Sequence, residues 1–216
     1  MDRAWVQPTN QEAPVAKTPI PADSGQQPLD LSQSFDLSMT DDALVTFGAP
    51  VGPGALSFVD VGYMPVNALT VGGGVVDLKG KLDGLFVHYS ATGVQHLSAT
   101  GIPTTADYTS LQYELVGYKG DATFTHATDG TPTLAGAKHL TVLAQGSLLP
   151  GMGHLVSGPD GSITGDVNTS LQVNGQVAGT LDFSVQHAAG DLGPAANGFT
   201  LSAGTLHATF VPLAVG

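Results

Sequence analysis

The chain has 216 residues, no cysteine, and 18 Asp and Glu residues against 6 Lys and Arg, which gives a formal net charge of −12 at pH 7. This charge disfavours nucleic acid as a partner, because such binding needs Lys and Arg to neutralise phosphates. It also disfavours anionic membrane surfaces. No run of about 18 apolar residues is present, so no helical membrane span is predicted.

Residues 1–28 form a proline-rich arm that differs in composition from the rest of the chain. Such a segment is typical of extended or flexible chain that has no core of its own. Trp5 in this arm is either an anchor into a groove of a neighbouring subunit or a solvent-exposed residue. The arm residues that we single out as assembly contacts are Trp5, Pro8, Pro14, Pro19 and Pro21. We predict a homo-oligomer or another assembly whose subunits make contact through this arm.

The composition of the chain predicts little helix. Only 11% of the residues are charged, and Glu12 and Glu114 are the only glutamates. Glu and Lys furnish the solvent faces of ordinary helices, so a chain that lacks them has little from which to build those faces. Thr, which is abundant here, suits the exposed positions of strands.

A period of two begins at Leu29 and predicts strands. From Leu29 to Met39 the apolar residues occupy odd positions and Asp and Ser occupy even ones, with Gln33 as the single exception. This pattern is typical of a strand with one wet face. The pair Asp41-Asp42 is interpreted as a turn, followed by a short strand at Ala43–Phe47. Further strands are predicted at 55–63, 66–78, 84–90, 94–99, 108–118, 121–127, 138–148, 162–173, 176–187, 198–203 and 205–213.

The segment 167–187 carries the clearest alternation, because all its Val, Leu and Phe residues occupy odd positions. A single strand of this length would span roughly 70 Å, too long for a domain of this size. Asn174-Gly175 is therefore predicted as a hairpin turn. A two-residue loop would place the two apolar sets on opposite faces, whereas a three-residue loop keeps them together, so we predict a three-residue loop with a G1-type bulge.

These elements predict an all-β fold in which residues 29–216 form a single antiparallel domain. Twelve to fourteen strands with short connections indicate either a β-sandwich or a closed β-barrel. The parity of the apolar residues changes at Gly204, which predicts a bulge or a tight bend there.

Histidines are the candidate ligand-binding residues, because imidazole binds metals or haem and can act as a base. His88 and His96 flank Ala91-Thr92-Gly93, which is interpreted as a turn, so the two could meet across a hairpin. His126 shares a face with Phe124, and His187 lies at the end of an apolar stripe. Each of these histidines is also explained by a structural role alone. No metal-binding spacing supports a metal site, and no cofactor is predicted.

Three functions remain open from the sequence. The first is a non-catalytic structural or assembly protein of an extracellular layer, a filament or a virion shell. The second is a secreted β-barrel that binds a small ligand, and the third is a barrel-based cyclase or hydrolase. The lack of catalytic motifs favours a protein that is not an enzyme without deciding the point. We expect an extracellular or cell-surface location, with a virion as the alternative, although residues 1–30 contain no signal peptide pattern.

Overall fold

The structure, a computed structural model, describes residues 32–78 and 80–213. The predicted arm, including Trp5 and its prolines, lies outside the described residues. The described chain is nearly all antiparallel strand, as predicted, with one short 3₁₀ helix. The elements are β1 (Phe35–Gly52), β2 (Ala55–Val71), β3 (Gly74–Val75), β4 (Gly84–Leu97), β5 (Pro103–Lys119), β6 (Thr123–His126), β7 (Pro132–Ala135), β8 (Lys138–Ser157), β9 (Ile163–Val173), β10 (Gln176–His187), η1 (Ala189–Asp191), β11 (Leu192–Ala195) and β12 (Gly198–Pro212).

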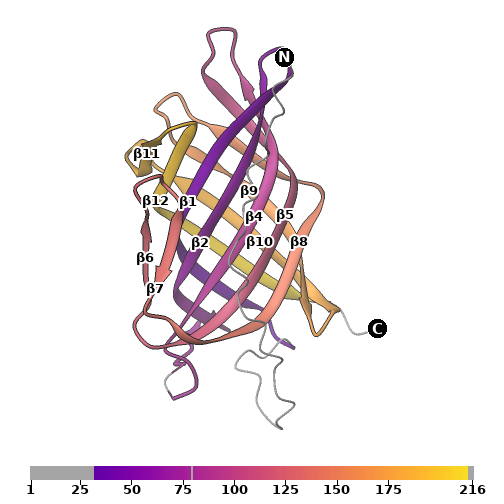
Figure 1. Cartoon of the computed structure of the whole chain (residues 1–216). Helices are drawn as coiled ribbons and strands as arrows, with labels where there is room; N and C mark the ends of the chain where they lie inside the picture. The colour runs from indigo at the N-terminus through magenta and orange to yellow at the C-terminus, as the bar shows by residue number, and fades with distance from the viewer. Residues whose placement is uncertain (1–31, 79, 214–216) are drawn as a thin grey trace, which may run out of the picture.

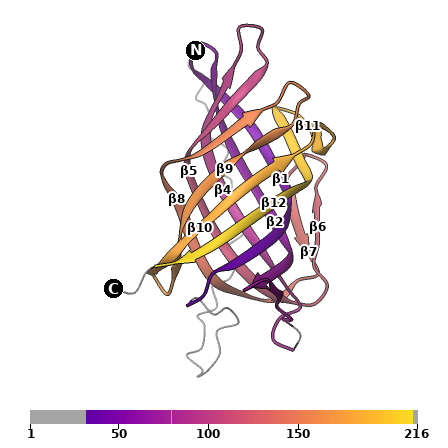
Figure 2. The ribbon, with the colours of Figure 1, turned by 180° about the vertical axis from the view of Figure 1, so that it is seen from behind.

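Eight long strands close into an up-and-down β-barrel (Figures 1 and 2). Going round the barrel, the order is β1, β2, β4, β5, β8, β9, β10 and β12, and pairing of β12 with β1 closes it. Of the two architectures predicted, the closed barrel is therefore the one that forms. No helix in the described part of the chain is long and apolar enough to cross a membrane.

Two ends of the barrel can be distinguished by their connections. The upper end in Figure 1 carries the β1–β2, β4–β5 and β8–β9 turns and the longer β10–β12 connection, which contains η1 and β11. The lower end carries the β2–β4, β5–β8 and β9–β10 connections. The β5–β8 connection includes the β6–β7 hairpin, which lies on the outer face of the barrel beside β1 and β2.

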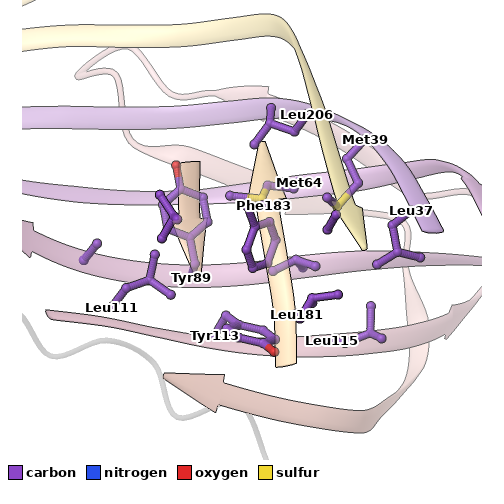
Figure 3. Packing of buried hydrophobic residues seen from close by; sticks show 14 of the residues in the cluster. Leu37, Met39, Met64, Tyr89, Leu111, Tyr113, Leu115, Leu181, Phe183 and Leu206 are labelled. Atoms are coloured by element: carbon purple, nitrogen blue, oxygen red, sulfur yellow. The ribbon is translucent and has the colours of Figure 1, made fainter. Parts of the chain in front are cut away.

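The hydrophobic core fills the lower and middle parts of the barrel. The odd-numbered residues of β1 point inward and contribute to it. Phe35, Leu37 and Met39 are almost completely buried. On β12 the inward residues include Phe210, whose ring stacks on that of Phe35 at a centroid distance of 4.7 Å. Leu115, Leu181 and Phe183 complete the packing that Figure 3 shows. The packed lower part of the barrel is thus apolar inside, and Asp36, Ser38 and Asp42 of β1 alternate to the outside.

Two predicted turns are wrong, because the strands pass straight through them. Asp41-Asp42 lies within β1, where a bulge shifts the pairing with β12, and Ala91-Thr92-Gly93 lies within β4, where the pairing with β5 shifts. Asp and Gly are turn residues in isolation, but here each segment has a paired strand on both sides. The bulge opposite Asp41 sits at Ala203 (φ 60°), next to the parity change predicted at Gly204.

The predicted hairpin at Asn174-Gly175 is confirmed, but its loop is shorter than expected. Val173 pairs with Gln176, and Asn174 and Gly175 have φ of 50° and 78°, as in a type I′ turn. The extra residue is Ala178, because the register shifts between Val177 and Gly179. This bulge in β10 does what the longer loop was expected to do. It keeps Leu181 and Phe183 of β10 on the same inner face as Val167 and Leu171 of β9, whereas Val177, on the turn side of the bulge, is exposed.

Replacing Gly175 with Ala is expected to destabilise the protein by about 1–2 kcal/mol, because a Cβ is unfavourable at positive φ. Urea unfolding followed by circular dichroism would measure this. Gly190 is the matched control, since no atom lies within 4 Å of a Cβ there and its φ is not positive. Equal losses in Gly175→Ala and Gly190→Ala would contradict the assignment of the turn.

Candidate functional site

Five polar side chains converge inside the barrel from five different strands. They are Asp41 of β1, Asp60 of β2, Tyr89 of β4, Tyr108 of β5 and His187 of β10, and we call them the inner polar cluster. The two aspartates and His187 are each at most 3% exposed. Burying an ionisable group without a partner costs free energy, so the contacts among these side chains decide whether the cluster is tolerated.

Hydrogen bonds join four of the five side chains. The Tyr108 hydroxyl donates to Oδ2 of Asp60 at 2.7 Å. The Tyr89 hydroxyl lies 3.1 Å from Oδ1 of Asp60, and 3.3 and 3.4 Å from the two carboxylate oxygens of Asp41. One hydroxyl has a single hydrogen and can donate to only one of the two carboxyl groups at a time. Its oxygen can accept from the other only if that carboxyl group is protonated, so the geometry favours a retained proton.

The pKa shifts agree with a retained proton. Burial, together with the nearby charge of Asp41, raises the pKa of Asp60 to about 7 against the opposing hydrogen bonds from the tyrosines. Burial also raises the pKa of Asp41, although His187 and Tyr89 act in the opposite direction. Burial, together with the two carboxylates, raises the pKa of both tyrosines, so both stay hydroxyl donors.

His187 is the member of the cluster with unsatisfied atoms. Its Nε2 lies 3.4 Å from Oδ2 of Asp41, yet neither ring nitrogen makes a hydrogen bond within the described residues. The ring lies against Gly204 of β12, where an added Cβ would collide with it. The bulge at Ala203 precedes this glycine. Local backbone irregularity thus makes room for a buried imidazole with capacity for a further partner.

A cavity opens directly above the inner polar cluster, towards the upper end of the barrel. Asp41, Asp60, Tyr108, His187 and Gln95 contribute to its lining, and its other walls are mostly apolar, formed by residues such as Phe58, Phe199 and Leu206. The volume within the cavity that the centres of water molecules can occupy is about 50 Å³. At roughly 10–15 Å³ for each water, this is space for about three to five waters, or for a molecule of roughly half a dozen non-hydrogen atoms.

The predicted site histidines do not come together. His187 alone lines the cavity. His88 and His96 both lie on β4, opposite Glu114 and Thr105 of β5, so their predicted meeting across a hairpin is wrong. The ring of His88 stacks on Tyr63 at 4.9 Å.

His126 belongs to the β6–β7 hairpin and helps to hold it against the barrel. Its Nε2 donates to the carbonyl oxygen of Ala43 in β1 at 3.1 Å. Phe124, on the same face of the hairpin as predicted, packs against Tyr63 and Phe86. His126 thus has a structural role in this arrangement. Within residues 32–78 and 80–213, no group of three or more His, Asp or Glu side chains is placed to hold a metal ion.

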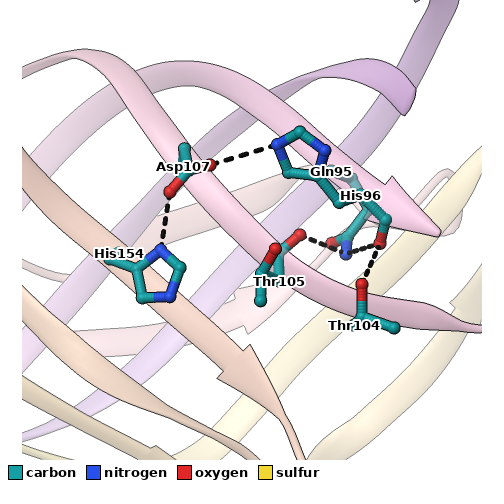
Figure 4. A network of polar contacts seen from close by, with 6 residues as sticks. All are labelled: Gln95, His96, Thr104, Thr105, Asp107 and His154. Atoms are coloured by element: carbon teal, nitrogen blue, oxygen red, sulfur yellow. Dashed lines mark hydrogen bonds and ion pairs between the residues drawn. The ribbon is translucent and has the colours of Figure 1, made fainter. Parts of the chain in front are cut away.

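His96 belongs to a second polar network, on the outer face of the barrel (Figure 4). His96 Nε2 lies 3.1 Å from Oδ2 of Asp107, and His154 Nδ1 lies 2.6 Å from Oδ1 of the same carboxylate. Gln95, the neighbour of His96, points inward and donates from Nε2 to the carbonyl oxygens of His96 and Thr105. The network therefore joins β4, β5 and β8 on the outside of the wall that lines the cavity.

We expect Asp107→Asn to lower the free energy of unfolding by less than about 1 kcal/mol at pH 7, because all three side chains are close to half exposed. Hydrogen bonds from His154 and His96 lower the pKa of Asp107. A lowered carboxyl pKa stabilises the fold above the ordinary pKa of 3.8, and this contribution is lost as pH falls through the folded-state value. The difference from the unsubstituted protein should therefore vanish in acid. Asp121→Asn, at an exposed residue, should show no such dependence.

Comparisons of the chain with protein-family models, curated proteins and solved structures give no match. The fold and the inner cluster place the protein in a structural class only. It is an eight-stranded up-and-down β-barrel with an acidic cluster below a cavity. Asp41, Asp60, Tyr89 and Tyr108 were missed as site residues from the sequence. For Asp41 a signal was present, because it continues the odd-numbered inward series of Met39 and Ala43.

Proposed function

We propose that this protein binds a small molecule in the cavity of its barrel. The observation that carries the proposal is His187, a buried imidazole without a hydrogen-bond partner among the described residues, which lines a cavity together with Asp41 and Asp60. Small-molecule sites combine mostly apolar walls with a few converging polar groups, and they occur inside β-barrels. Buried acids that destabilise the fold are also typical of sites retained for function rather than for stability.

The cavity also favours binding over an assembly role as the first hypothesis to test. The assembly hypothesis depends on residues 1–28, which lie outside the described residues, and it stays a prediction. The convergence of Asp41, Asp60 and His187 is compatible with acid–base chemistry as well. A binding site comes first in either case, because a barrel-based cyclase or hydrolase would need the same cavity to hold its substrate.

The first experiment uses a neutral probe of suitable size, 3-methylbutan-1-ol. We expect saturable shifts of the methyl resonances of Val45, Leu155 and Leu206, which line the cavity. With six non-hydrogen atoms, the probe should bind with a Kd in roughly the millimolar range or tighter. Ala106→Leu adds three carbon atoms to the cavity wall and should weaken binding at least tenfold.

Ala127→Leu is the matched control, because Ala127 is exposed in the β6–β7 turn and the substitution adds the same bulk. It should bind the probe as the unsubstituted protein does. Linear, non-saturating shifts in the unsubstituted protein, or equal binding in both variants, would contradict a site in the barrel cavity.

A further inference from the structure

The polar atoms that face the cavity can be sorted into donors and acceptors. Tyr108 has already donated its hydrogen to Asp60, and the hydroxyl hydrogen of Tyr89 is shared between the two aspartates. Gln95 Nε2 already donates hydrogen bonds to the carbonyl oxygens of His96 and Thr105. An amide nitrogen has two hydrogens and a hydroxyl group has one, so these donors are used up.

The acceptors of the site have capacity left. Each carboxylate oxygen can accept more than one hydrogen bond, and a neutral imidazole has one acceptor nitrogen. His187 has neither ring nitrogen in a hydrogen bond within the described part of the chain. No Lys or Arg among the described residues lines the cavity. The site therefore offers a ligand two carboxyl groups and further acceptors, and no Lys or Arg side chain that would attract an anion; the donors left beside them are a ring N–H of His187 and the hydroxyl group of Ser157.

We propose that the ligand is a small protonated amine, with its ammonium group on Asp60, Asp41 and His187 and its apolar body against Phe58, Phe199 and Leu206. This inference rests on the proposed function. An ammonium group supplies up to three N–H donors and a positive charge, which complement the two buried carboxyl groups of the inner polar cluster. An amine of roughly half a dozen non-hydrogen atoms, with the nitrogen counted among them, fits the cavity described above.

Proton release should accompany binding. The groups that face Asp60 are Asp41 from β1, Tyr89 from β4, Tyr108 from β5 and His187 from β10. The pKa of Asp60 is about 7 when the cavity is empty, so this carboxyl group is mostly protonated in mild acid. An ammonium ion favours the ionised form and displaces this proton. Alkylamines stay protonated in this range, as lysine does, so the ligand does not itself titrate.

The test compares three probes of matched shape by calorimetry at pH 8: 3-methylbutylamine, 3-methylbutan-1-ol and 3-methylbutanoate. We expect the amine to bind at least tenfold more tightly than the alcohol, and the carboxylate to bind more weakly than either. The amine affinity should fall about tenfold for each pH unit below about 7, because binding requires ionised Asp60. Titrations repeated at pH 6, where Asp60 is mostly protonated, in buffers with different ionisation enthalpies should reveal the release of a proton.

Asp60→Asn should remove the preference, so that amine and alcohol bind this variant with similar affinity and with little pH dependence. His187→Gln should weaken amine binding while leaving the pH dependence in place, since Asp60 is intact. Equal binding of amine and alcohol to the unsubstituted protein would overturn the amine inference and leave the proposed function standing. Failure of all three probes to shift the cavity resonances would instead overturn the proposed function.

Discussion

Asp60→Asn is expected to make the protein more stable at pH 8 by about 1–3 kcal/mol, while leaving its stability near pH 4 almost unchanged. Burial raises the pKa of Asp60 from 3.8 to about 7, which corresponds to a penalty on the order of 4 kcal/mol. Asparagine has no charge to desolvate, and its side-chain oxygen can still accept from the Tyr108 hydroxyl. The expected gain is smaller than the penalty because the geometry of the carboxyl group is not reproduced in full.

The sign of the pH dependence follows from linkage. Below pH 3.8 Asp60 is protonated in the folded and the unfolded chain, so the fold carries no penalty. Between pH 3.8 and about 7 the unfolded chain loses this proton and the folded chain keeps it, so stability falls as pH rises. Above about 7 both forms are ionised and the loss is constant. Thermal unfolding of both proteins between pH 4 and 8 would measure the difference.

Asp121→Asn is the control for the change of charge, because Asp121 is exposed. It should shift the unfolding temperature equally little at both ends of the pH range. If Asp60→Asn gave a difference that did not vary with pH, the retained proton in the inner polar cluster would be contradicted.

Phe210→Ala should destabilise the protein by about 3–5 kcal/mol without altering its dependence on pH. Phe210 is completely buried, its ring stacks on Phe35, and both lie in the packed lower part of the barrel. Removal of the ring leaves a cavity that the surrounding strands cannot close, because hydrogen bonds to β1 and β10 hold β12 on both sides. Urea unfolding at pH 5 and pH 8 would measure both the loss and its independence of pH.

Val211→Ala is the matched control one residue along the same strand. Val211 is 47% exposed on the outer face, so its truncation should cost less than about 1 kcal/mol. Similar losses in the two variants would contradict the assignment of the faces of β12. The probe affinities at the cavity should be the same in both variants, since neither residue contributes to its lining.

The alternation of apolar and polar residues along the sequence was sufficient to predict an antiparallel β fold and many of the side chains that face the inside of the barrel. The inward series of β1 and the hairpin at Asn174-Gly175 are local patterns, and a strand period or a turn pair reports them directly. Asp41-Asp42 was misread because aspartate favours turns in isolation. Its burial depends on strands that are distant in the sequence, and no local pattern contains that pairing.

The inner polar cluster is a product of tertiary structure in the same sense. Asp60 meets Tyr108 and Tyr89 only because β2, β4 and β5 are neighbours in the closed barrel. His187 was predicted as a candidate from its place at the end of an apolar stripe, and it does lie in the cavity lining. His88, His96 and His126 had comparable local surroundings but alternate to the outer face or lie on the outer hairpin. Their binding roles stay predictions.

The dense packing around Phe35 and Phe210 has a kinetic consequence. It blocks the lower half of the barrel, so a ligand bound on Asp60 as proposed would have to arrive and depart past the upper turns and the segment that joins β10 to β12. Residence time should then respond to substitutions in those upper connections. Substitutions in the packed lower end should change the rate of unfolding rather than the residence time of the ligand.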